Sequence, residues 1–159
     1  MQLSEHLSLA EVMRSESAKR HGISNMPTEE HIENFKKLAL NIFEPIRTYF
    51  NVAIHVSSGY RSAALNRAIG GAVSSQHCKG EAIDIDMDGT SITNKQIFDY
   101  IKDNLKFDQL IAEFPRKNNP EWVHVSFSSS GNQRNQILVA QKINGKTVYI
   151  PYKSDKDLI

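Results

Sequence analysis

Residues 74–86 read SSQHCKGEAIDID. A histidine precedes the glycine of this stretch and three acids follow it, and the last two acids alternate with two isoleucines. The alternation predicts a strand over residues 81–87, because successive side chains of a strand point to opposite faces of its sheet. The apolar face can pack on a hydrophobic core while Asp84 points into a cleft. A buried carboxylate is costly unless it is paired or binds a metal ion. This stretch therefore predicts a core strand with a polar site on its other face.

Two histidines are candidate partners of Asp84 in a metal site. His77 lies upstream of the strand, and Gly80 permits a tight bend that brings its imidazole back toward Asp84. His124 lies in EWVHVSF, residues 121–127, where alternation predicts a second strand with this histidine on its polar face. A catalytic zinc site needs three protein ligands and an open fourth position for water. We therefore expect Zn²⁺ at His77, Asp84 and His124, although Mn²⁺ or Co²⁺ suits the same donors.

The order of predicted elements indicates the fold class. The 159 residues are enough for one domain over residues 1–159 with a sizeable core. The expected helices cover residues 8–22, 28–50, 62–71 and 93–105, and Pro45 is expected to kink or end the second of them. The expected strands cover residues 51–58, 81–87, 109–114, 121–127, 136–143 and 146–152. Most of the expected helices precede most of the strands, and regular β-α-β alternation is absent. This order predicts an α+β domain with N-terminal helices and an antiparallel sheet. We expect the zinc site in a cleft on that sheet.

The composition argues against several classes of protein. A formal net charge of +1 without a basic stripe gives no reason to expect nucleic acid as a partner. No apolar run approaches the roughly 18 residues of a membrane span, and residues 1–22 do not resemble a secretory signal, so we expect synthesis in the cytoplasm and no membrane partner. The single cysteine, Cys78, excludes an intrachain disulfide framework and a multi-cysteine zinc site. The expected assembly is a monomer.

Three sequence blocks resemble one known family. Residues 75–84 fit S-x-H-x-x-G-x-A-x-D, the signature of the zinc D-alanyl-D-alanine carboxypeptidase family, which also includes D-Ala-D-Ala dipeptidases and phage L-alanyl-D-glutamate endopeptidases. SSGYRS, residues 57–62, resembles the block that precedes this signature, and EWVHVSF resembles the closing block. The blocks follow the family's order, and the N-terminal helices resemble those of its small single-domain branch.

The resemblance implies roles for individual residues. It implies that His77, Asp84 and His124 hold zinc, in agreement with the reading of the strands. It implies that Arg61 binds the substrate carbonyl and stabilises the developing oxyanion. A helix cap or a surface ion pair is the lesser alternative for this residue. Ser75 is implied to form a hydrogen bond with the substrate or with a residue around the metal.

Two glutamates compete for the role of catalytic acid. Glu121, three residues before His124, occupies the position that the resemblance implies for this acid, which would take a proton from water and give it to the leaving amine. Strict alternation places Glu121 on the opposite face from His124, so this role requires a bend, which Pro120 can impose. Glu113 is the alternative, since it is an acid in the apolar strand QLIAEF. The spacing favours Glu121.

The resulting hypothesis is a zinc-dependent peptidase that hydrolyses the peptide stems of bacterial peptidoglycan. Carboxypeptidase and endopeptidase activity both remain open, because they depend on how loops 115–120 and 128–135 close the cleft. The alternative is a non-catalytic binding or structural module that keeps the zinc on the same fold. A compact domain without wall-binding repeats resembles a phage enzyme, for which we expect release by phage lysis or transport on a virion.

Overall fold

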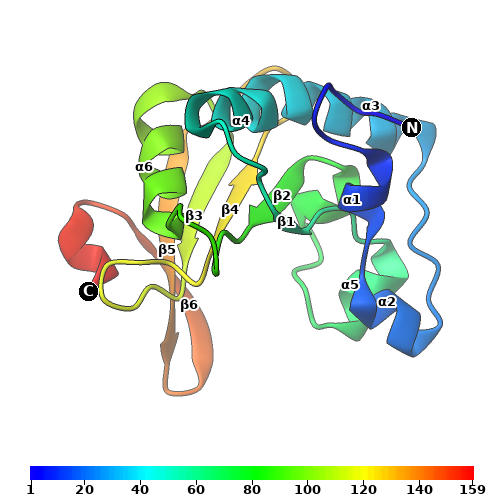
Figure 1. The fold of residues 1–159 in the computed structure, drawn as a ribbon. Helices are drawn as coiled ribbons and strands as arrows, with labels where there is room; N and C mark the ends of the chain where they lie inside the picture. The colour runs from blue at the N-terminus through cyan, green and yellow to red at the C-terminus, as the bar shows by residue number, and fades with distance from the viewer.

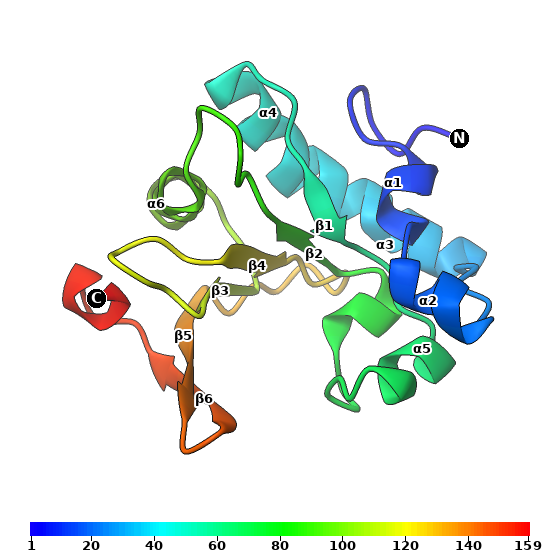
Figure 2. The same ribbon diagram turned by 60° about the horizontal axis from the view of Figure 1, so that its bottom comes forward.

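A six-stranded sheet divides the protein into a face covered by helices and a face that carries a cavity (Figures 1 and 2). The computed structural model describes residues 1–159. The helices are α1 Leu9–Met13, α2 Glu16–His21, α3 Glu29–Leu38, α4 Glu44–Phe50, α5 Ala63–Ala68 and α6 Asn94–Asn104. The strands are β1 Val56–Ser58, β2 Ala82–Ile85, β3 Gln109–Glu113, β4 Trp122–Ser126, β5 Gln136–Ile143 and β6 Lys146–Pro151. The α+β class is confirmed.

The N-terminal helices differ from the prediction in where they break. The single helix expected over residues 8–22 is divided into α1 and α2, because the Ser15 side chain accepts a hydrogen bond from the backbone N–H of Ala18 and starts a new helix. The second helix passes Pro45 without ending. A π-helical turn, η1 Ala39–Phe43, joins α3 to α4 directly before this proline. Proline has no N–H to donate, and the change of hydrogen-bond pattern in the π turn accommodates its absence.

The sheet is mixed, which corrects the expectation of a purely antiparallel one. Its strand order is β1-β2-β4-β3-β5-β6, and every neighbouring pair is antiparallel except β3 and β5. After β4, the loop 127–135 crosses the end of β3, so β5 starts at the same end as β3 and runs parallel to it. β5 then returns as β6 through the turn at Asn144 and Gly145, as the sequence predicts.

The apolar face of β2 joins the main core, as its alternation predicts. Ile83 and Ile85 are fully buried in one hydrophobic cluster with residues of α3 and α6, among them Phe35 and Phe98. Figure 1 shows α3, α4 and α6 lying over the same side of the sheet. Asp84 points to the opposite side, into the cavity. No helix is both long and apolar enough to cross a membrane.

Gly80 connects the fold to the site, because its backbone must reverse between His77 and β2. Its φ of 75° lies in the left-handed region, and a Cβ here would overlap the backbone carbonyl of His31 in α3. We expect Gly80→Ala to lower the free energy of unfolding by more than about 2 kcal/mol, because it combines backbone strain with a steric clash. Denaturant unfolding of the metal-free protein measures this loss.

Gly89→Ala is the matched control for Gly80→Ala. Gly89 has a φ of 79°, but open space surrounds the position of its missing Cβ. Its substitution should therefore cost only about 1 kcal/mol, the strain of the left-handed backbone. Equal losses in the two variants would contradict a close contact between the turn and α3.

Candidate metal centre

Three separate elements bring His77, Asp84 and His124 together. Asp84 on β2 and His124 on β4 are directly opposite each other in the antiparallel register, so both side chains leave the same face of the sheet. His77 belongs to a short 3₁₀ helix, η2 Gln76–Lys79, which Ser75 caps by accepting the backbone N–H of His77. All three side chains are buried. They form one group whose donor atoms lie close enough to hold a single metal ion.

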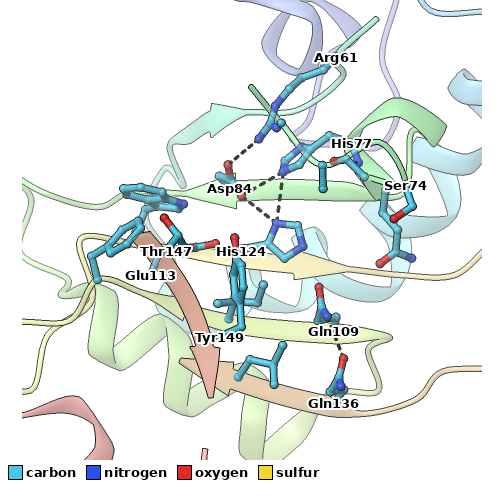
Figure 3. Close-up of a pocket in the computed structure, with 18 of the residues that line it drawn as sticks. Arg61, Ser74, His77, Asp84, Gln109, Glu113, His124, Gln136, Thr147 and Tyr149 are labelled. Carbon is cyan, nitrogen blue, oxygen red and sulfur yellow. Dashed lines mark hydrogen bonds and ion pairs between the residues drawn. The ribbon is translucent and has the colours of Figure 1, made fainter. Parts of the chain in front are cut away.

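The distances among the donor atoms fit a small tetrahedral ion (Figure 3). His77 Nε2 lies 3.2 Å from Asp84 Oδ1, and His124 Nδ1 lies 3.1 Å from the same oxygen. The two imidazole nitrogens are 3.2 Å apart. Zinc bonds of about 2.0–2.1 Å in a tetrahedron imply ligand separations of roughly 3.3 Å. The three atoms therefore form a nearly equilateral triangle of the right size for zinc.

The hydrogen bonds around the histidines also favour a cation. His77 Nδ1 lies 2.7 Å from the carbonyl oxygen of Gly59 and donates its hydrogen there, so Nε2 presents a lone pair toward Asp84. Burial would raise the pKa of Asp84, but positive charge and hydrogen bonding from the side of His77 and His124 hold this pKa well below its usual range, and a cation bound there would supply the same kind of charge. A carboxylate facing nitrogen lone pairs is stabilised when a cation lies between them. The donor set thus fits Zn²⁺ in chemistry as well as in size.

Arg61 lies beside the ligands rather than on a helix end or on the outer surface. Its Nη2 is 3.5 Å from Asp84 Oδ2, the oxygen that does not face the histidines. Ser58 and Asn66 hold the rest of the guanidinium, at 3.5 Å from Nε and 3.4 Å from Nη1. Asn66 also donates to the carbonyl of Ala72, which ties Arg61 to the loop at the edge of the cavity.

A cavity of about 780 Å³ opens over these residues. Its floor is the polar face of β4, β3 and β5, with Thr147 and Tyr149 of β6 on one side and the loop 70–76 on the other (Figure 3). Ser75, Arg61 and all three candidate ligands line it. A space of this size accommodates a peptide segment of several residues.

Comparison with known families agrees with this geometry. The sequence model of the peptidase M15 family matches residues 5–126, a range that includes every candidate ligand. The chain belongs to the peptidase M15 family. M15 peptidases are zinc-dependent metallopeptidases, so the family accounts for the donor set of His77, Asp84 and His124. No curated protein matches the chain.

The structure places Glu121, the glutamate that the sequence favours as the acid, outside the cavity of the three candidate ligands. The backbone bends at Glu121, and its N–H donates to the carbonyl of Glu113 at 2.8 Å, one residue out of the register in which Glu113 pairs with Trp122. This bend does not bring the Glu121 side chain into the cavity that His124 lines. Glu121 is half-exposed, lies 3.4 Å from Arg116, and lines a separate, smaller pocket.

Glu113 occupies the position that Glu121 was expected to fill. It is only 7% exposed, lines the cavity, and points into it beside His124 (Figure 3). Burial and the nearby charge of Asp84 raise the pKa of Glu113 to about 7, against the opposite effects of His124 and Arg61. A carboxyl group with this pKa can both accept and release a proton near neutral pH.

The prediction from sequence assigned no site residues to the β5–β6 hairpin, which forms a wall of the cavity. Gln136 and Leu138 of β5 and Thr147 and Tyr149 of β6 all line it. Their alternation along each strand was visible in the sequence. What the sequence did not reveal is that β5 pairs with β3, and this pairing brings the hairpin to the metal centre.

We expect the metal-free protein to bind one Zn²⁺ per chain through the three candidate ligands. His124→Ala should weaken this binding by at least about 100-fold, because it removes one of three protein ligands. His21→Ala, an exposed histidine of α2, is the control and should leave the affinity unchanged. Competition with a chromophoric chelator measures both variants. Equal affinities would show that zinc binds elsewhere.

The raised pKa of Glu113 predicts a pH-dependent stability difference in the metal-free protein. Between its ordinary pKa of 4.5 and its folded pKa of about 7, the folded state retains the proton while the unfolded state releases it. Wild-type protein therefore loses stability as pH rises through this window, and Glu113→Gln does not. From pH 5 to pH 8, the free energy of unfolding of Glu113→Gln should therefore rise by about 2 kcal/mol relative to that of wild type. Denaturant unfolding at the two pH values measures the gain, and a constant difference would contradict the burial of an ionisable carboxyl group.

Proposed function

We propose that this protein is a zinc-dependent peptidase that hydrolyses amide bonds in the stem peptides of bacterial peptidoglycan. The observation that carries the proposal is the convergence of a zinc-type ligand set, Arg61 and the buried Glu113 on one peptide-sized cavity. Membership of the M15 family supports a metallopeptidase acting on peptidoglycan peptides. His77, Asp84 and His124 would hold the ion. When bound there, zinc polarises a scissile carbonyl group and lowers the pKa of water.

Arg61 supplies positive charge next to the ligands. As water adds to the carbonyl carbon, the carbonyl oxygen becomes negative, and a guanidinium fixed nearby stabilises that charge without having to reorganise. Ser58, Asn66 and Asp84 hold Arg61 in place before the substrate arrives. Arg61 thus binds the oxygen that changes charge during the reaction.

Glu113 moves the proton. It accepts a proton from the attacking water and delivers it to the nitrogen of the scissile bond as the carbon–nitrogen bond breaks, so the products are a carboxylate and an amine. Its burial and its raised pKa suit both transfers. Ser75 lines the same cavity but caps η2 through its hydroxyl group, so its proposed part is to fix His77.

A pair of glutamate variants tests this function. Glu113→Gln removes the titratable group while keeping its size, and we expect kcat to fall by a factor of about 10²–10⁴ with one zinc still bound per chain. Glu121→Gln changes the other glutamate and should leave kcat within about twofold of wild type, because its side chain lies outside the cavity. Mass spectrometry of stem peptides, with a chelated control, measures turnover and identifies the bond that is cut.

The other outcomes have definite meanings. A large loss in Glu121→Gln with none in Glu113→Gln would overturn the assignment of the acid. A zinc-loaded wild-type protein that releases no product from any stem peptide would overturn the peptidase proposal and favour a zinc-containing binding module.

A further inference from the structure

The two ends of the cavity differ in chemistry. His124 pairs with Ile111 at the centre of β3, and strand geometry places Glu113 about 7 Å to one side of this centre and Gln109 about 7 Å to the other. Figure 3 shows Glu113 and the pair Gln109–Gln136 on opposite sides of His124. The cavity thus has an acid end at Glu113 and an amide end at Gln109.

This asymmetry sets the direction of a bound peptide. In the proposed function the carboxyl group of Glu113 must reach the nitrogen that leaves. The leaving half of the substrate therefore lies over the acid end. The acyl half, which retains the cleaved carbonyl group, extends over the amide end.

An ion pair between a buried carboxylate and an exposed arginine adjoins the amide end. Asp108 is 5% exposed, and its two oxygens accept hydrogen bonds from Arg134 Nε at 3.1 Å and Arg134 Nη2 at 2.8 Å. The backbone N–H of Arg134 donates to the same carboxylate at 3.1 Å. Asp108 therefore fixes Arg134, whose side chain lines the cavity.

Arg134 keeps binding capacity after this pairing. The guanidinium group has five N–H donors, and Asp108 engages only the edge formed by Nε and Nη2. The side chain is 57% exposed, and it lines the cavity. A planar guanidinium held at one edge presents its remaining donors in a fixed direction, which suits a carboxylate.

We propose that Arg134, held by Asp108, binds a carboxylate on the acyl half of the substrate. The inference rests on the proposed function and extends it to substrate specificity. Asp108 lies three residues before Ile111, so Arg134 acts about 10 Å from the metal centre, or roughly three residues along an extended peptide. Gln109 and Gln136, which are joined by a 2.8 Å hydrogen bond between them, lie between the two points and offer amide groups to the peptide backbone.

The proposal limits which bond of a stem peptide can be cut efficiently. In L-Ala-γ-D-Glu-L-Lys-D-Ala-D-Ala, a cut between the D-alanines leaves the glutamyl α-carboxylate on the acyl half. A cut after L-alanine leaves no such carboxylate there. We therefore infer that the enzyme prefers bonds that follow an anionic residue on the acyl side, with the D-Ala-D-Ala bond as the main example.

Two stem pentapeptides that differ in one group test this inference. The first carries D-isoglutamate with its free α-carboxylate, and the second carries D-isoglutamine, in which that carboxylate is an amide. Wild-type enzyme should cleave the D-Ala-D-Ala bond of the first peptide with a kcat/KM about tenfold higher than that of the second. The ratio is moderate because Asp108 partly neutralises Arg134 and so weakens its attraction for the substrate carboxylate. Arg134→Gln should bring this ratio close to one.

The ratio of the kcat/KM values for the two substrates does not depend on the fraction of a variant that folds. Asp108→Asn keeps the charge of Arg134 but loosens its position, and should lower the ratio partially. Arg67→Gln alters an exposed arginine of α5 that does not line the cavity, and should keep the wild-type ratio. A wild-type ratio near one, or a tenfold ratio retained in Arg134→Gln, would overturn the proposed carboxylate site while leaving the peptidase function intact. No cleavage of either peptide, or of any other stem peptide, would instead refute the peptidase function itself.

Discussion

The antiparallel register between β2 and β4 is the constraint on which the site depends. It places Asp84 directly opposite His124, and the same register sends the isoleucines of β2 into the core. A slip of one residue would exchange the two faces of the strand, burying the carboxylate in the core and exposing the isoleucines. Hydrophobic burial therefore fixes the position of a candidate metal ligand with the same interaction that stabilises the domain.

Two asparagines, Asn34, which is buried, and Asn25, which is half-buried, extend this order into the loops around the site. Asn34 on α3 donates to the carbonyl of Lys79 at 2.8 Å and so holds η2, which carries His77. Asn25 donates to the carbonyls of Met13 and Tyr60 and accepts the backbone N–H of Ser62, which secures the segment that contains Arg61. These side chains satisfy backbone groups that the loops would otherwise leave unpaired. Helix α3 and the loop between α2 and α3 thus act on the site through hydrogen bonds to the backbone rather than through direct contact with substrate.

Local patterns in the sequence predicted that His77, Asp84 and His124 come together, because each position follows from alternation within its own strand or from a glycine turn close to it. The choice between Glu113 and Glu121 was harder. Motif spacing favoured Glu121, whereas strand alternation opposed it, and the structure places the side chain of Glu113, not that of Glu121, in the cavity over the candidate ligands. Pro45 and the parallel pairing of β5 with β3 also escaped prediction, because both depend on how distant segments pack. Periodicity within one segment carries no information about that packing.

The β5–β6 hairpin lies beyond residue 126, where the match to the M15 family ends, yet it forms one wall of the cavity. The metal ligands and both candidate acids come from the segment before that point. The proposed reactive centre therefore lies within the matched segment, whereas part of the cavity wall follows it. Substitutions at the cavity-lining positions of the hairpin can alter the choice of peptide while the residues of the reactive centre are kept.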